Sequence, residues 1–253
     1  AKKMKIIGAA NLQLAIKDSE VFLLEVNPRA SRTLPFVSKS TGYPLARLAV
    51  RAMLGQKLDH LPELIEMKGV SVKVPTFSWL KIIGLDTVLG PEMKSTGEAM
   101  GHGPTFGTAY LKAMKGGNKT IPTTGTVFLS VSNKLKLEFG DVAQELIDLG
   151  FNLIATKGTA AHLRRRGIDS KVIWRISDRK QPDILSVMRN KRVDLIINLP
   201  TGRRAATDGA QMRRLAVELG IPFITTLTGV KAAINSLKEG EAKHLEPLKK
   251  IEI

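Results

Sequence analysis

Residues 127–159 read VFLSVSNKLKLEFGDVAQELIDLGFNLIATKGT and contain the most regular pattern in the sequence. The runs VFLSV (127–131) and FNLIAT (151–156) are short and almost continuously apolar, which is typical of strands buried on both faces. A helical segment is expected near 140–149, between the two runs. A strand, a helix and a second strand in this order predict a parallel pair joined by a crossover helix.

The same alternation continues toward the C-terminus. Further strands are expected at 171–176, 194–199 and 222–226, and further helices near 159–167, 181–190, 208–219 and 228–238. The fold class is therefore α/β, and residues 121–253 are predicted to form a doubly wound parallel-sheet domain. Ligands of such sheets bind beyond the carboxyl ends of the strands, so candidate site residues are sought there.

Toward the N-terminus the periodicity weakens. The stretch KGGNKTIPTTG, 115–125, has the composition of a linker and predicts a domain boundary. Before it, a helical run is expected at 105–114, after the glycine-rich loop LGPEMKSTGEAMG, and VSVKVPTF alternates like a strand. Residues 57–120 are interpreted as a connector.

The first segment, 1–56, is predicted to hold a β-hairpin and a helix. The runs NLQLAI and VFLLEV flank a polar turn at 17–20, and PLARLAVRAML ends at Gly55, a typical helix stop. The apolar second strand is expected to be core. A turn centred on Ser19 places Gln13 opposite Glu25, whereas a slip of half a residue makes the two side chains face opposite ways.

Composition excludes several classes of protein. The 253 residues include no cysteine, so disulfides and thiolate metal ligands are impossible. The N-terminal residues lack the apolar run of a signal peptide, and no apolar run is long enough for a membrane span, so a cytoplasmic protein without a membrane partner is expected.

The formal net charge of +16 raises the question of a nucleic-acid partner. Single-stranded nucleic acid is usually bound by aromatic platforms beside the positive charge, and only 5% of the residues are aromatic. No nucleic-acid partner is expected, although a basic nucleic-acid binder stays as an alternative.

Polar side chains end the second strand of the hairpin. Glu25 and Asn27 lie two residues apart, so they leave the same face, and carboxylate and amide oxygens suit Mg²⁺. Arg29 and Arg32 follow the turn at Pro28 and could hold a phosphoryl group. An ordinary Asn-Pro turn with a paired edge carboxylate explains the same residues without a ligand.

Two motifs resemble one family. EVNPRASRTLPFVSKSTGYPLA, from Glu25 on, resembles the signature of the ATP-grasp halves of the carbamoyl phosphate synthetase large subunit. LGPEMKSTGEAMG resembles a segment between the second ATP-grasp domain and the C-terminal regulatory domain of the same subunit. The resemblance implies a partial ATP-grasp (α+β) segment, use of ATP with Mg²⁺ or Mn²⁺, and a ligase activity in the complete subunit.

The resemblance also implies roles for single residues. Gln13 joins Glu25 and Asn27 as a metal ligand, and Arg29 and Arg32 contact phosphate and carbamate. Glu98 matches a residue of an ornithine activator site, although a glutamate that caps its own helix turn is the simpler interpretation.

No glycine-rich phosphate loop precedes Gln13, so the chain matches only the final third of an ATP-grasp domain. We expect it to be inactive alone, as an excised fragment or a split-gene product. Its partners would be the remainder of the large subunit and the glutaminase small subunit, which supplies ammonia from glutamine.

The turn at 155–159, ATKGT, predicts a phosphate site. Hydroxyls, a flexible glycine and the amides of the following helix can form an anion-binding nest, although an ordinary N-capped helix start fits as well. Two further strand ends converge on the same rim, with Ser130 and Lys136 after one strand and Asn198 after another.

These residues resemble a methylglyoxal synthase-like regulatory domain that binds a nucleotide monophosphate. The resemblance implies phosphate contacts from Thr156, Lys157, Gly158, Thr159 and Lys136, and a nucleotide contact from Asn198. Leu199-Pro200 replaces a threonine pair of some members, so uridylate and inosinate both stay open. Thr225 matches an ornithine contact, but Phe223 replaces a tyrosine, so a response to ornithine is open.

Two further functions are weighed for this domain. A stand-alone nucleotide-binding regulator fits the same residues. Methylglyoxal synthase itself needs a carboxylate base facing the phosphate loop, and Gln181 occupies that position with Asp183 two residues on, which disfavours this enzyme.

Overall fold

The computed structural model describes residues 2–57, 68–79, 87, 89, 92–200 and 206–239, except the side chains of residues 206 and 207. The chain divides after Ser71 into two compact units, and each is described by itself. Within the described ranges, no helix has both the length and the apolarity to cross a membrane. The boundaries expected at 56/57 and 120/121 stay predictions.

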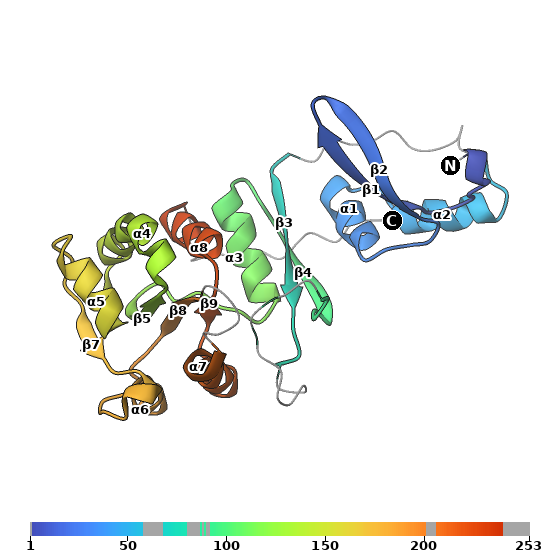
Figure 1. Ribbon diagram of the computed structural model, residues 1–253. Helices are drawn as coiled ribbons and strands as arrows, with labels where there is room; N and C mark the ends of the chain where they lie inside the picture. Colours follow the sequence, from blue (N-terminus) through green and yellow to red (C-terminus); the bar gives the residue numbers. More distant parts are fainter. Residues whose placement is uncertain are drawn as a thin grey trace. The chain divides into compact units, whose positions relative to one another are not determined.

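The first unit begins with a 3₁₀ turn, η1 (Lys2–Met4), and the antiparallel hairpin β1 (Asn11–Lys17) and β2 (Glu20–Asn27), followed by helices α1 (Thr33–Thr41) and α2 (Leu45–Met53) (Figure 1). The expected hairpin and the α2 helix are confirmed. Asp18 and Ser19 form the turn with φ of 49° and 66°, the left-handed pair that a two-residue hairpin turn requires.

The register of the hairpin differs from the expected one in an informative way. Lys17 pairs with Glu20, so the turn is centred between Asp18 and Ser19 rather than on Ser19. A β-bulge then adds one residue to β2, and Gln13 pairs with Glu25 beyond it. The turn is therefore slipped by half a residue from Ser19, and Gln13 nevertheless pairs with Glu25 because of the bulge.

One face of the hairpin is apolar. We call its exposed part the apolar hairpin face, which consists of Leu12, Leu14, Ile16, Val21 and Leu23. Their side chains are between 53% and 76% exposed, so the expectation that this strand is core is wrong for the chain by itself. Hydrophobic burial alone would favour covering this face with another surface.

The second unit starts with the connector. Strands β3 (Val70–Thr76), whose first two residues precede the division, and β4 (Gly97–Gly103) form a two-stranded sheet, and helix α3 (Phe106–Gly116) follows. The second half of the expected glycine-rich loop is therefore strand. A Cβ built on Gly101 would overlap the carbonyl oxygen of Ala109, so only glycine lets α3 pack this closely on β4.

The connector packs on the α/β domain through helices. Leu111 of α3 and Ala233 of α8 (Leu227–Glu239) belong to one buried cluster, and the carboxylate of Glu239 accepts a 2.7 Å hydrogen bond from the amide of Gly107 at the start of α3. The described residues from Val72 to Glu239 thus belong to one compact unit.

The rest of the unit is the expected doubly wound domain. Its five-stranded parallel sheet has the order β7-β6-β5-β8-β9. The strands are β5 (Gly125–Val131), β6 (Phe151–Thr156), β7 (Lys171–Ile173), β8 (Leu195–Leu199) and β9 (Phe223–Ile224). The helices are α4 (Lys136–Asp148), α5 (Lys157–Arg164), α6 (Ile184–Arg189), α7 (Ala206–Leu219) and α8, with 3₁₀ turns η4 (Asn133–Leu135) and η5 (Ile176–Asp178).

Helices cover both faces of this sheet, with α4, α5 and α8 on one side and α6 and α7 on the other (Figure 1). Alternate residues of one strand enter different cores, because Val127 and Leu129 pack under the first group and Phe128 under the second. The chain winds outward from β5 through β6 to β7, and from β8 to β9 on the other side. The strand order therefore switches between β5 and β8.

Candidate functional site

A cavity of about 420 Å³ lies at this switch point, where ligands of doubly wound sheets bind. Three expected residues line it: Ser130 at the end of β5, Thr156 at the end of β6 and Asn198 on β8. The rule that ligands meet the carboxyl ends of parallel strands thus located the cavity.

The start of α5 adjoins the cavity. Thr156 precedes the helix in an extended conformation, and Lys157 is exposed at its first position. Thr159 is buried, and its hydroxyl oxygen accepts hydrogen bonds from the amide of Val131 (3.1 Å) and the hydroxyl of Thr156 (3.1 Å). Thr159 therefore ties α5 to β5, a structural role that the sequence did not indicate.

Lys136, at the start of α4, reaches the same helix end. Its ammonium lies 3.3 Å from the position of a Cβ built on Gly158 and donates a 2.7 Å hydrogen bond to Asn133. Partial burial lowers the pKa of Lys136, and the nearby charges of Arg175 and Arg165 lower it further. Cations gathered beside helix amides favour an anion such as phosphate.

Several residues of the cavity were missed by sequence reasoning. Arg175 and Ser177 follow β7, so the strand-end rule would have found them, whereas Asp208 comes from α7. The carboxylate of Asp208 accepts hydrogen bonds from the amide (3.0 Å) and hydroxyl (2.5 Å) of Ser177. The hydroxyl of Ser132, also in the lining, is buried without a hydrogen-bond partner, which suits a site that receives a polar ligand.

A buried arginine holds the side chain of Asn198 in place. Asn198 is buried, and its side-chain oxygen accepts a hydrogen bond from the guanidinium of Arg213, which is itself only 1% exposed. Because Arg213 uses the oxygen of this amide, the NH₂ group is the part of Asn198 that can donate to a ligand.

The structure gives no support to the methylglyoxal synthase alternative at the two positions where a catalytic base was considered, Gln181 and Asp183. The carboxylate of Asp183 accepts a 2.8 Å hydrogen bond from the amide of Ser186 and caps α6, while Gln181 accepts one from the amide of Asp183 at 3.2 Å. Neither residue lines the cavity.

In the first unit, the expected metal ligands share the polar face of the hairpin. Gln13 pairs with Glu25 across the strands. The side-chain NH₂ group of Asn27 donates a 2.8 Å hydrogen bond to the carboxylate of Glu25. One carboxylate with two amides is a donor set of the kind that Mg²⁺ or Mn²⁺ accepts, so these residues fit a hard cation.

The two expected phosphate-binding arginines follow on the same unit. Arg29 lies just after the turn, where its guanidinium donates a 3.1 Å hydrogen bond to the carbonyl of Ala30, and Arg32 precedes α1. Both are exposed. Among the described residues, no group of three or more His, Cys, Asp or Glu side chains could hold a metal ion, so an ion at the hairpin would depend on the amide ligands.

The described residues do not bring the two ornithine candidates together in one cavity. Glu98 on β4 forms an ion pair with Lys73 on β3, with 3.3 Å between nitrogen and oxygen. Thr225 lines a second cavity of about 740 Å³ between the connector and α7, and Glu98 is not in its lining. The described lining of this cavity contains no carboxylate.

Comparison with known proteins finds family matches in both halves of the chain. Residues 1–61 match the family model of the carbamoyl-phosphate synthase L chain ATP binding domain, and residues 138–225 match that of the MGS-like domain. A carbamoyl phosphate synthase large chain, C-terminal section, from Methanocaldococcus jannaschii is 46% identical over 94% of this chain. The chain belongs to the carbamoyl phosphate synthase large-chain family.

Other members of the carbamoyl phosphate synthase family are equally similar. The large chain of Archaeoglobus fulgidus is 45% identical over 97% of this chain, and the C-terminal section from Methanopyrus kandleri is 42% identical over 94%. The chain spans 40% of the Methanocaldococcus protein, 23% of the Archaeoglobus protein and 46% of the Methanopyrus protein.

A solved methylglyoxal synthase from Elizabethkingia anophelis is similar over 45% of this chain and 79% of its own, with 17% identity and a TM-score of 0.39. The fold assignment rests on the parallel sheet and on the two family models.

Proposed function

We propose that this chain is the C-terminal part of the large chain of a glutamine-dependent carbamoyl phosphate synthase, and that its parallel-sheet domain binds a nucleotide monophosphate that regulates the complete enzyme. The observation that carries the proposal is the cavity at the switch point, where Ser130, Thr156, Asn198 and Arg175 meet in the lining and Lys136 lies at the adjoining start of α5.

A nucleoside monophosphate suits this cavity in charge and in size. Its phosphate would lie at the start of α5, where helix amides and Lys136 offer donors and positive charge. The space of about 420 Å³ is within the range of small-molecule sites and leaves room for ribose and base. Uridylate and inosinate are the two candidate effectors.

The hairpin would complete a second site, for the ATP-dependent phosphorylation of carbamate. Gln13, Glu25 and Asn27 would hold Mg²⁺ or Mn²⁺, which would supply positive charge to neutralise the negative charge of phosphate. Arg29 and Arg32 would orient the transferred phosphoryl group.

The apolar hairpin face would be covered by another protein surface in the complete enzyme. We propose that the preceding part of the large chain provides this surface. All five of its side chains are more than half exposed, and the chain spans less than half of the three relatives compared above. The chain alone would then lack part of the active site and would be inactive, and the glutaminase small subunit would supply ammonia.

Isothermal titration calorimetry with uridylate and inosinate tests the regulatory half. We expect one nucleotide to bind, and Arg175→Met to weaken its binding, while Arg192→Met, which removes an exposed arginine outside the cavity lining, leaves binding unchanged. Duplex DNA titrated over a salt series is the comparison. Steeply salt-dependent DNA binding without any nucleotide response would favour the nucleic-acid alternative.

Reconstitution tests the synthetase half. The chain is mixed with a separately produced upstream part of a large chain and with its small subunit, and carbamoyl phosphate formation from glutamine, bicarbonate and ATP is measured. We expect activity only in the mixture, and its loss with Glu25→Gln, which keeps the shape of the side chain and removes the charge. Nucleotide binding without any complementation would support a stand-alone regulator.

A further inference from the structure

Helix α7 borders both cavities of the second unit. Asp208, Gly209 and Met212 line the switch-point cavity, whereas Ala216 and Val217, about one turn further on, line the second cavity beside the connector. A helix of this length moves as one body when it shifts between packed neighbours. A displacement of α7 at the switch-point cavity would therefore also move the residues of α7 that line the second cavity.

Two consecutive arginines tie α7 to different partners. The guanidinium of Arg213 bonds Asn198 of β8, in the wall of the switch-point cavity. A Cβ built on Gly209 would lie 2.8 Å from Arg213, so glycine at this position leaves room for the buried guanidinium. Arg213 thus connects the position of α7 to the side chain of Asn198.

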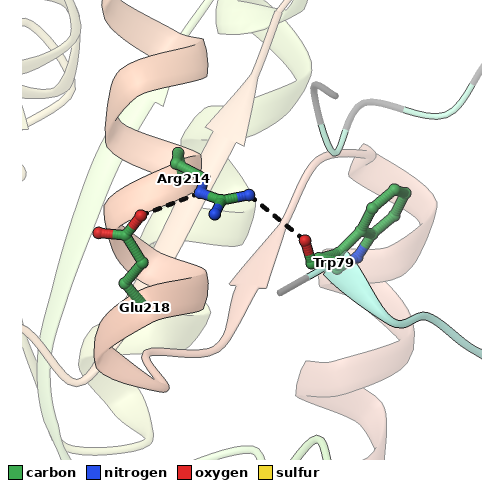
Figure 2. Close-up of polar contacts among 3 residues, drawn as sticks. All are labelled: Trp79, Arg214 and Glu218. Carbon is green, nitrogen blue, oxygen red and sulfur yellow. Dashed lines mark hydrogen bonds and ion pairs between the residues drawn. The ribbon is translucent and has the colours of Figure 1, made fainter. Parts of the chain in front are cut away.

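Arg214 holds the connector. Its guanidinium donates a 3.3 Å hydrogen bond to the carbonyl oxygen of Trp79 and a 2.9 Å hydrogen bond to the carboxylate of Glu218, one turn along α7. Figure 2 shows the guanidinium between these two acceptors. The side chain of Trp79 is 9% exposed and stacks on Phe77 at 4.6 Å between ring centroids, and both aromatic residues line the second cavity.

We propose that α7 couples the nucleotide cavity to the connector, with Arg213 and Arg214 as positioning residues at its two contacts. This inference rests on the proposed nucleotide site. A ligand that engages Asn198 changes the contact of Asn198 with Arg213, α7 adjusts, and Arg214 carries the change to the backbone at Trp79. Coupling of this kind is reciprocal, so the state of the connector also alters nucleotide affinity.

The two tryptophans of the chain allow a direct test. Trp174 directly precedes the cavity residue Arg175, and Trp79 lies at the connector contact. The chain is labelled with 5-fluorotryptophan, its two ¹⁹F NMR resonances are assigned with Trp174→Phe, and uridylate and inosinate are titrated in parallel with calorimetry. We expect binding heat and a shift of both resonances with the same nucleotide.

Arg214→Met keeps the aliphatic part of the side chain and removes both donors. We expect binding heat and the Trp174 shift to persist in this variant, and the Trp79 shift to be lost. Glu218→Gln, which weakens the hold on the guanidinium without touching Trp79, should reduce the Trp79 shift. Arg192→Met serves as the matched control and should leave both shifts unchanged.

Each other outcome is decisive. Binding heat with no Trp79 shift in the unmodified chain overturns the coupling and leaves the nucleotide site standing. A Trp79 shift of equal size in Arg214→Met overturns the role of Arg214. Absence of both heat and the Trp174 shift overturns the nucleotide site, and the coupling with it.

Discussion

Gln13 lies across the hairpin from Glu25 because β2 contains one residue more than β1 between the turn and this pair. The pairing that starts at Lys17 and Glu20 would, if continued without interruption, place Gln13 opposite Leu24. The bulge shifts the register by one residue and brings Glu25, together with Asn27 on the same face, to the side of Gln13. The proposed metal site thus depends on an irregularity of the ladder.

The turn of this hairpin offers the first prediction. Ser19 has a φ of 66°, a conformation that costs an L-residue about 1–2 kcal/mol and glycine almost nothing. Ser19→Gly should therefore slow amide hydrogen exchange in β1 and β2, with a gain of up to about 1 kcal/mol in opening free energy. Ser19→Ala is the control and should give no gain. Faster exchange in Ser19→Gly would contradict the turn geometry.

Thr159 should be needed for stability as well as for binding. Thr159→Ala leaves the buried amide of Val131 without its acceptor, which should lower the free energy of unfolding by about 1–3 kcal/mol. Thr159→Ser keeps the hydroxyl and should lose much less. Urea denaturation of both variants measures the difference, and equal loss in the two would show that the methyl group, rather than the hydrogen bond, matters.

Lys136 should be needed for nucleotide binding but not for stability. Burial and the charges of Arg175 and Arg165 lower its pKa, so the folded protein disfavours its positive charge. Lys136→Met should leave the free energy of unfolding unchanged or slightly higher. Its affinity for the nucleotide should fall about tenfold, which corresponds to about 1.4 kcal/mol. Calorimetry and urea denaturation of the same preparation test both halves, and a parallel loss of stability and affinity would argue against this account.

His162 gives a prediction for pH. Burial, Arg165, Arg166 and Lys136 lower the pKa of His162 below its ordinary value of 6.5, so the unfolded chain binds the proton more readily than the folded one. The free energy of unfolding should rise with pH between the pKa of His162 in the folded protein and 6.5. Below that window the loss of stability caused by His162 is complete. His162→Gln should flatten this part of the curve of unfolding free energy against pH. A slope that is unchanged in the variant would assign it to other groups.

Sequence reasoning was most successful where local pattern and burial agree. The strands at 127–131 and 194–199 are mostly apolar because both of their faces are covered, and their positions located Ser130 and Asn198 at the cavity. Helix α2 was expected from its apolar spacing and its stop at Gly55.

Sequence reasoning failed where tertiary contacts, rather than the local pattern, determine the structure. Strand β4 is rich in glycine and has a weak propensity for strand, yet α3 packs over Gly101 and fixes it there. The bulge in β2 has no local sequence signal, since the alternation of apolar residues fits several registers. Asp208 lines the cavity from α7, and Arg213 of the same helix bonds Asn198 in the cavity wall; the strand-end rule does not consider this helix.

The apolar hairpin face has a consequence for how a cell must make this protein. A surplus of the chain over the proposed upstream part would present five neighbouring aliphatic side chains to water, and such patches promote precipitation and capture by chaperones and proteases. Synthesis in matched amounts, from one transcript or one reading frame, would keep that surplus small.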